Sequence, residues 1–356
     1  MVAGFVVYVL EPGSGRVATM VEFSTKLLVG FLPVVLLLLC LIYLDSYKLV
    51  GLRPVLIAIV AGGLAAGVGY LLNAALWGQL AWEVGLYSRY VAPLVEETLK
   101  ALLLVYLIRS HRIGFLVDAA IFGFAVGAGF ALIENLYYLN LVGDARLVVW
   151  IVRGFGTAFM HGGATAIFGI VSKTLADRRS SAGPAVFLPG LLLAVVVHSF
   201  YNHFFLSPML STLAILVVLP PLLALVFHYS ERSVQDWLGV GFDADTELLE
   251  LINSGSLSES RVGRYLHSLT ERFHGPVVAD MLCYLRLHTE LSLRAKGELM
   301  MRELGFRSEL ETETRAKFEE MKYLERSIGA TGRLAMAPFL HVSGKTLWQL
   351  YMLEQK

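Results

Sequence analysis

Polar and charged side chains lie inside hydrophobic stretches of this sequence. They comprise three glutamates, one lysine, two histidines and one asparagine: Glu96, Glu97, Lys100, Glu134, His161, His198 and Asn202. A charge at the centre of a bilayer costs at least about 2.5–3.5 kcal/mol, so such residues persist where they pair, face a cavity or have a function. Carboxylates and imidazoles are common general acids and bases, which makes hydrolysis by activated water the first chemistry to consider.

The spacing of these residues is consistent with one site on helices. Glu96 and Lys100 are four residues apart and Glu97 and Lys100 are three apart, so both glutamates are within reach of the lysine. Lys100 can therefore act as a structural charge partner that keeps one carboxylate ionised while the other faces a cavity. His198 and Asn202 are also four apart and share a helix face.

Each residue type has a role in peptide-bond hydrolysis. A buried carboxylate such as Glu96 or Glu97 can take a proton from water, and a histidine can share that task or protonate the leaving amine. A histidine or Asn202 can donate a hydrogen bond to the developing oxyanion. No serine or cysteine is convincingly paired with a histidine at this depth, which argues against a covalent nucleophile.

The same side chains also offer metal ligands. Glu96, His161 and His198 form a set of two histidines and one glutamate, which is a known catalytic zinc set. The sequence has no H-E-x-x-H motif, and these ligands would come from separate helices. We therefore expect hydrolysis without a required cofactor and keep zinc as the alternative.

The distribution of charge divides the chain into two parts. Hydrophobic residues make up 56% of the sequence, compared with about 45–50% in soluble proteins. Residues 1–229 hold 23 of the 58 charged side chains, and residues 230–356 hold the other 35. This division predicts an all-α, polytopic membrane bundle followed by a small helical soluble domain. The net charge is zero and no basic block is present, which argues against nucleic-acid binding.

Seven stretches approach the length of about 20 mostly apolar residues that a membrane span requires. They cover residues 27–44, 55–76, 92–108, 115–139, 154–172, 185–206 and 209–228. The predicted organisation is an extracytoplasmic tail (1–26), a transmembrane domain (27–229) and a cytoplasmic helical domain (230–356). Pro220 and Pro221 are expected to kink the seventh span or mark its end.

Basic loop residues predict the orientation of the bundle. Loops on the amino-terminal side carry five lysines and arginines, and loops on the other side carry eight. By the positive-inside rule, the amino terminus lies outside and the carboxyl terminus in the cytoplasm of a multi-pass cell-membrane protein. The polar residues on four spans then lie within roughly 5–12 Å of the outer ends of those spans. Asp118 lies near the cytoplasmic end instead, where we expect it to form a structural pair with an arginine such as Arg112.

The C-terminal region also has helical patterns. Apolar residues recur with a helical period around residues 278–285 and 318–328, and residues 343–353 are amphipathic. Pro276 is placed to begin one helix, and Gly305 and Gly329 are placed to end others.

Two other classes of protein remain open on spacing alone. A proton-coupled transporter could use intramembrane glutamates and histidines as a relay. However, the seven spans show no inverted repeat, and the polar groups lie toward one face. A non-proteolytic scaffold that binds transmembrane proteins would keep the fold without the chemistry, but it would not need to keep both Glu96 and Glu97.

Four motifs of this sequence resemble those of the PrsW family of intramembrane proteases, which is similar to the CAAX-processing endoproteases. Residues 95–100 (V-E-E-T-L-K) resemble the family's E-E-x-x-K motif, and residues 130–135 (F-A-L-I-E-N) resemble its F-x-x-x-E motif. His161 in the next span and His198-x-x-x-Asn202 complete the set in the same order. The resemblance covers roughly residues 25–230. Asn202 stands where the family pattern often has aspartate.

The resemblance implies an intramembrane endopeptidase that cuts a membrane-anchored protein, with residues 27–229 as its protease domain and a possible role in regulated proteolysis. Its implied catalytic residues are Glu96, Glu97, Glu134, His161, His198 and Asn202. The family has been described both as glutamic and as metal-dependent, so a zinc site at Glu96, His161 and His198 stays open. The expected partners are a single-span membrane protein substrate and the lipid bilayer, and the oligomeric state is not predicted.

Overall fold

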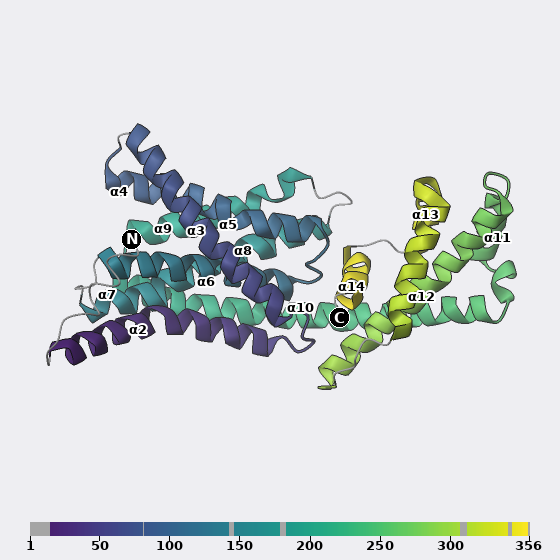
Figure 1. Cartoon of the computed structure of the whole chain (residues 1–356), viewed down its shortest axis with the longest axis horizontal. Coiled ribbons are helices and arrows are strands. Elements are labelled where there is room, and N and C mark those ends of the chain that lie inside the picture. The colour runs from purple at the N-terminus through teal and green to yellow at the C-terminus, as the bar shows by residue number, and fades with distance from the viewer. Residues whose placement is uncertain are drawn as a thin grey trace.

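The protein was analysed as a computed structural model that describes residues 15–80, 82–141, 146–178, 183–306, 312–340 and 344–354. Helices make up 89% of the structure, and no strand occurs among the described residues. The all-α prediction is therefore confirmed. Residues 1–14 of the predicted N-terminal tail lie outside the described residues. A helical bundle occupies one end of the long axis. Residues 230–356, which we call the tail, extend from the bundle toward the other end of this axis (Figure 1).

Six segments in the described part of the chain are long and apolar enough to cross a membrane. These are Met20–Leu44, Leu52–Leu80, Leu116–Leu141, Leu147–Asp177, Pro184–His203 and Pro208–Asn253. They correspond to six of the seven predicted spans. The remaining one is helix α5 (Ala92–Arg109), which packs against α3, α8 and α9 but carries four charged residues in its 18 positions. The six spans are supported by length and composition, while the seventh stays a prediction.

The bundle is built around α6 (Leu116–Leu141). In the most apolar 18-residue stretch of this helix, 83% of the residues are buried. Its main neighbours are α3 (Leu52–Leu80) and α8 (Ala158–Asp177). A Cβ atom at Gly127 would lie 2.2 Å from the carbonyl oxygen of His161 on α8. A Cβ atom at Gly129 would lie 2.0 Å from the carbonyl oxygen of Ile59 on α3. The small-residue pattern of α6 therefore brings three helix backbones into direct contact, as such patterns do in membrane bundles.

The outer layer of the bundle consists of α2 (Gly15–Leu44), α9 (Leu188–His203) and the first part of α10 (Pro208–Asn253). Short irregular segments precede two of the inner helices. Helix α4 (Val84–Leu86) and the π-helical turn η1 (Tyr87–Val91) lead into α5. Helix α7 (Leu147–Ile151) and the π-helical turn η2 (Val152–Thr157) lead into α8, and the 3₁₀ turn η3 (Pro184–Val186) precedes α9. Single π-turns inside helices are frequent at functional sites.

Helix α10 differs from the prediction. Pro220 and Pro221 lie inside it, and the helix continues for more than thirty residues beyond them, to Asn253. The alternative that the proline pair ends the helix is wrong, because neighbouring groups in a membrane bundle can satisfy the backbone that a proline frees. The alternative of a kink stays a prediction. The helix also passes through the predicted domain boundary at residue 229 without interruption.

The tail is helical, as its sequence pattern predicted. It comprises the end of α10, η4 (Ser256–Glu259), α11 (Arg261–Leu269), α12 (Gly275–Glu303), α13 (Thr312–Leu340) and α14 (Gly344–Glu354). Pro276 lies in the first turn of α12, and Gly305 follows its end with a φ of 83°. Gly329 interrupts α13 with a φ of 65°. Both glycines therefore have a positive φ, which favours glycine and ends or interrupts a helix.

Helix α14 joins the tail to the bundle. Trp348 packs edge-on against Phe115, with ring centroids 5.2 Å apart, and also against Trp237 of α10. A Cβ atom at Gly114 would lie 2.4 Å from the Trp348 ring, so only glycine fits there without rearrangement. Because Gly114 and Phe115 lie between α5 and α6, this junction marks the tail side of both helices.

The predicted partner of Asp118 is wrong. Its Oδ2 accepts hydrogen bonds from the backbone N–H groups of Gly114 (2.8 Å) and Phe115 (3.2 Å). Arg112 instead stacks on the rings of Tyr106 and Tyr351. Asp118 therefore closes the turn that begins α6.

Candidate functional site

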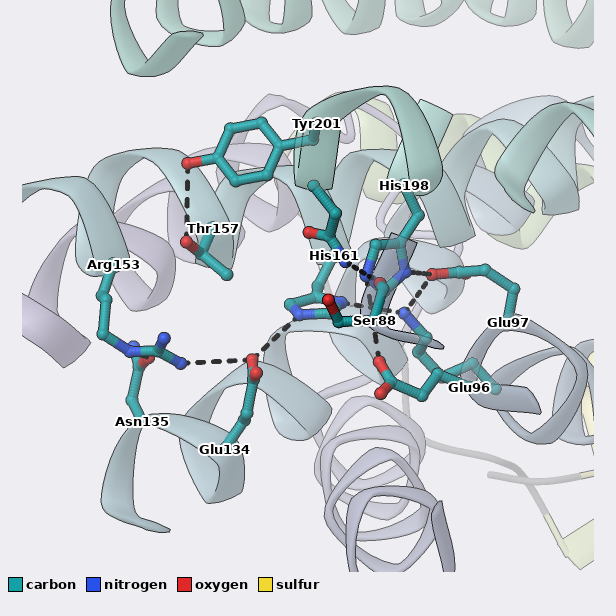
Figure 2. A network of polar contacts seen from close by, with 12 residues as sticks. Ser88, Glu96, Glu97, Glu134, Asn135, Arg153, Thr157, His161, His198 and Tyr201 are labelled. Carbon is teal, nitrogen blue, oxygen red and sulfur yellow. Dashed lines mark hydrogen bonds and ion pairs between the residues drawn. The ribbon is translucent and has the colours of Figure 1, made fainter. Parts of the chain in front are cut away.

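The polar residues of four helices meet in one network (Figure 2). Their positions along the helices put this network at the end of the bundle away from the tail. Glu96 and Glu97 lie in the second turn of α5, and Glu134 lies near the end of α6. His161 lies in the first turn of α8, and His198 lies near the end of α9. Neighbouring helices run in opposite directions, so the beginnings of α5 and α8 and the ends of α6 and α9 lie together, which brings together residues more than 100 positions apart in sequence.

Glu97 is at the centre of this cluster, and one of its oxygens has two partners. Its Oε1 lies 2.5 Å from Lys100 Nζ and 2.7 Å from His198 Nδ1. All three side chains are buried, with exposed fractions of at most 3%. A carboxylate buried in this way is tolerated when it is paired and hydrogen-bonded. Because Glu97 accepts the proton of His198 Nδ1, it leaves the Nε2 lone pair of that ring free.

His161 bridges Lys100 and Glu134. Its Nδ1 lies 3.0 Å from Lys100 Nζ, and its Nε2 lies 3.0 Å from Glu134 Oε2. A lysine ammonium can only donate, so Nδ1 accepts and Nε2 carries the proton that points to Glu134. The His161 ring also packs edge-on against the His198 ring, with centroids 4.8 Å apart. The two histidines therefore have fixed and different hydrogen-bonding patterns.

Glu96 is held differently from Glu97. Its side chain is 16% exposed, whereas that of Glu97 is 1% exposed. Oε1 accepts a hydrogen bond of 3.2 Å from Asn73 Nδ2, and Asn73 in turn accepts one of 3.0 Å from the Tyr87 hydroxyl. Oε2 faces His198 Nε2 at 3.9 Å, which is too long for a direct hydrogen bond. These two atoms therefore form a polar pair that a small third group can bridge.

Three supporting residues were not predicted from the sequence. Asn73 and Tyr87 position Glu96, as described above. Arg153, on η2, lies 3.3 Å from Glu134 Oε2 and donates to Asn135 Oδ1 at 2.9 Å. Arg153 was predicted as a loop residue because it precedes the apolar stretch 154–172. Its position within one helical turn of that stretch was the signal that it could face the cluster.

Asn202 lies on the same helix as His198 but makes a different contact. Its Nδ2 donates to the backbone carbonyl of Ser88 at 2.9 Å. This bond joins the end of α9 to η1, directly before the helix that carries Glu96. The oxyanion-donor role of Asn202 stays a prediction. The neighbouring His203 contacts Ser199 and Tyr90 at the edge of the bundle.

The fold and the site define a multi-pass membrane protein in which four helices enclose a carboxylate–histidine centre. Residues 51–226 match the family model described as PrsW family intramembrane metalloprotease. Residues 51–226 are thus a PrsW-family membrane bundle, and the protein is a multi-pass intramembrane protease whose substrates are membrane proteins. No curated protein and no solved structure matches the chain.

The family description names a metal, so we tested whether the residues present fit one. Glu96, His161 and His198 each offer a ligand atom, and these atoms lie within 4.8 Å of one another. Two imidazoles and a carboxylate are a catalytic zinc set. The Glu97–His198 hydrogen bond also has the form that orients zinc-binding histidines. The donor set fits a metal ion, although His161 would have to give up its bond to Lys100 or to Glu134.

Proposed function

We propose that the protein is an intramembrane endopeptidase in which Glu96 activates a water molecule opposite His198. The observation that carries this assignment is the pair Glu96 Oε2 and His198 Nε2, 3.9 Å apart. A hydrogen bond on the opposite side of each group holds it in place, from Asn73 to Glu96 and from His198 to Glu97. Such positioning is what a general base requires before its substrate arrives.

The adjacent glutamate has a supporting role in this proposal. Glu97 already accepts hydrogen bonds from Lys100 and His198, so it orients the imidazole and is not available as the base. Its charge favours a proton on His198 during the reaction, as the buried aspartate does in the serine-protease triad.

The proposed reaction balances without a covalent intermediate. Glu96 takes a proton from water, and the hydroxide adds to the substrate carbonyl carbon. The oxyanion is stabilised by a hydrogen bond from Asn202, whose Nδ2 has a second N–H beside the one donated to Ser88. Cleavage of the C–N bond then transfers the proton from Glu96 to the leaving amine. Glu134 and Arg153 hold His161 in place during these steps.

The position of the site suggests where the substrate is cut. The cluster lies at the end of the bundle opposite the tail, so a cytoplasmic tail implies a cut near the outer membrane face. The substrate we infer is a single-span membrane protein whose helix unwinds locally, because helical amides in lipid are otherwise hydrogen-bonded.

Zinc is the alternative source of an activated water. Glu96, His161 and His198 would hold it, and the ion would lower the pKa of its bound water and polarise the substrate carbonyl. In that case Glu97 would orient the ligand His198, and Lys100 would neutralise the charge of Glu97.

The test is cleavage of a panel of single-span membrane proteins by the purified chain in liposomes. Wild type would be compared with Glu96→Gln and His198→Ala, each with and without a chelator. Glu83→Gln is the matched control, because Glu83 is exposed and outside the cluster. We expect a loss of roughly 10²–10⁴-fold in kcat for Glu96→Gln, the usual contribution of a general base.

The outcomes separate the possible functions. Activity that survives chelation but not Glu96→Gln supports the glutamate-dependent reaction. Activity lost on chelation and restored by zinc assigns the site to the metal-dependent class. Absence of cleavage by folded wild type across the panel would instead favour a scaffold or a transporter.

A further inference from the structure

Large apolar side chains are exposed at the C-terminal end of α12. They are Met300 (46% exposed), Met301 (42%), Leu304 (71%) and Phe306 (58%), which we call the apolar tip. Single exposed apolar residues are normal on protein surfaces, but a contiguous group of them marks a site of interaction. The apolar tip therefore requires a partner that removes it from water.

Contacts next to the apolar tip fix its position relative to the membrane. Arg302 Nη1 donates to the backbone carbonyl of Lys48 at 3.1 Å. Glu303 is hydrogen-bonded to the side chain of Tyr47, which is only 2% exposed. Tyr47 and Lys48 directly follow the end of the membrane-spanning α2 at Leu44. The end of α12 is thus held at the level where α2 leaves the membrane.

Figure 1 shows the same relationship. The C-terminal end of α12 projects away from α11 and α13, back toward the side of the bundle where α2 ends. The apolar tip is therefore directed toward the bundle rather than toward the far end of the tail.

The surface beside the apolar tip has the composition of a membrane interface. Tyr43 (80% exposed), Leu44 (48%) and Leu52 (63%) present apolar surface at the ends of α2 and α3. The basic side chains of Lys48 and Arg53 are exposed between them. Apolar residues flanked by lysine and arginine are typical of segments that lie in the headgroup region. Through the contacts of Arg302 and Glu303 with Lys48 and Tyr47, the apolar tip lies next to a surface of this composition.

We propose that the apolar tip inserts into the headgroup region of the membrane leaflet on the tail side, so that its partner is the lipid surface. The tail is then attached to the membrane at a point separate from α10. This attachment does not depend on peptidase activity, so the two proposals can fail independently.

The experiment measures the depth of the apolar tip in liposomes of phosphatidylcholine and phosphatidylglycerol. Cys40 and Cys283, which are both exposed, would be replaced by serine in the full chain. An environment-sensitive fluorophore would be attached to Leu304→Cys or, as a control, to Leu334→Cys. Leu334 is 79% exposed and belongs to α13, a helix that Figure 1 shows farther from the bundle along the long axis.

Lipids carrying a spin label near the headgroup quench a fluorophore that enters their layer. We expect the Leu304 probe to be quenched several-fold more than the Leu334 probe. Equal and weak quenching of both probes would overturn the proposal and indicate a protein partner for the apolar tip.

A second set of variants tests whether the apolar side chains, rather than the fluorophore itself, cause insertion. With the probe at Met301→Cys, the paired substitutions Leu304→Asp and Phe306→Asp should reduce quenching to the level of the Leu334 probe. The melting temperature should not change, since both side chains are exposed. Undiminished quenching would contradict insertion of the apolar tip.

Discussion

At the scale of residues, two adjacent glutamates occupy different environments. Glu97 is enclosed by Lys100 and His198, whereas Glu96 keeps one oxygen on Asn73 and presents the other to an open position. Residues next to each other on a helix point about 100° apart, and this difference is enough to separate the two roles. The E-E-x-x-K spacing alone does not show which glutamate is the base. The geometry supports Glu96 as the base and Glu97 as the carboxylate that orients His198.

The first prediction concerns the hydrogen bond that positions Glu96. Asn73→Leu removes a donor to a carboxylate, a contact worth about 1.5–3 kcal/mol. We expect kcat to fall about 10–100-fold with little change in KM, because substrate contacts remain. Asn140→Leu is the matched control, since Asn140 is exposed and bonds only to a carbonyl of its own helix. A rise in KM at constant kcat would indicate substrate binding by Asn73 instead.

The second prediction concerns the buried Lys100–Glu97 pair. Lys100→Met leaves the Glu97 charge without its main partner, and breaking a buried pair in this way costs about 3–5 kcal/mol. We expect a clear fall in melting temperature in detergent. Lys322→Met, at an exposed pair with Glu354, should leave the melting temperature unchanged.

A double variant distinguishes the charge from the packing at the same position. Lys100→Met combined with Glu97→Leu replaces the pair by apolar groups and should recover most of the lost stability. It should remain inactive, because His198 loses its orienting carboxylate. A double variant less stable than Lys100→Met would show that the single substitution acted through packing.

The sequence predicted the residues of the cluster but not those that support it. Charged residues inside spans are conspicuous because of their energetic cost. Asn73 and Tyr87 carry no charge, so nothing in their composition marks them. Arg153 was assigned to a loop because it precedes the apolar stretch that begins at residue 154, and hydropathy does not reveal that η2 extends the helix back to Val152. Asn202 was identified, but its bond to Ser88 depends on how α9 approaches η1.

At the scale of elements, the distance between α6 and α8 controls the Glu134–His161 contact. Gly127→Ala would place a methyl group 2.2 Å from the His161 carbonyl oxygen, so the helices must separate. Overpacking of this kind costs about 1–3 kcal/mol. We therefore predict lower activity and a lower melting temperature, measured on the same detergent preparation.

Gly67→Ala is the matched control for this substitution. A Cβ atom there has no other atom within 4 Å, and alanine favours helices over glycine by about 1 kcal/mol. We expect unchanged activity and equal or higher stability. A similar loss in both variants would contradict the role of close packing at Gly127.

Helix positions in the bundle were predictable because the bilayer sets both their length and their composition. Predicted and observed ends of α5 differ by one residue, and those of α6 by one or two. Helix α10 was not predictable in this way. Its proline pair has the local signature of a break, and only packing in the bundle and the tail shows that the helix continues.

At the scale of the whole molecule, a buried carboxylate lies at the junction of bundle and tail. Asp45 is 3% exposed, and its Oδ2 accepts the backbone N–H of Val50 at 3.2 Å. Burial raises the pKa of Asp45 from 3.8 to about 6, against the opposing influence of those backbone bonds and of Lys48. The folded state therefore binds this proton more tightly than the unfolded state.

This shift gives a prediction for the pH dependence of stability. A carboxyl group with a raised folded-state pKa favours folding below about pH 4, and that contribution is lost as the pH rises to about 6. The difference of about two pKa units corresponds to about 3 kcal/mol. We expect the wild-type melting temperature to fall between pH 4 and pH 6.5 and the fall to be smaller in Asp45→Asn. Asp243→Asn, at an exposed position, should retain the wild-type dependence.

Helix α10 connects the two ends of the molecule. Its 46 residues give a length of about 69 Å at 1.5 Å per residue. At one end, Thr212 packs beside Gly156 of η2, the turn that also carries Arg153. At the other end, the helix forms part of the tail (Figure 1). Helix α10 therefore couples the tail mechanically to η2. A force that tilts the tail would move Thr212 relative to Gly156 and so shift Arg153, the partner of Glu134.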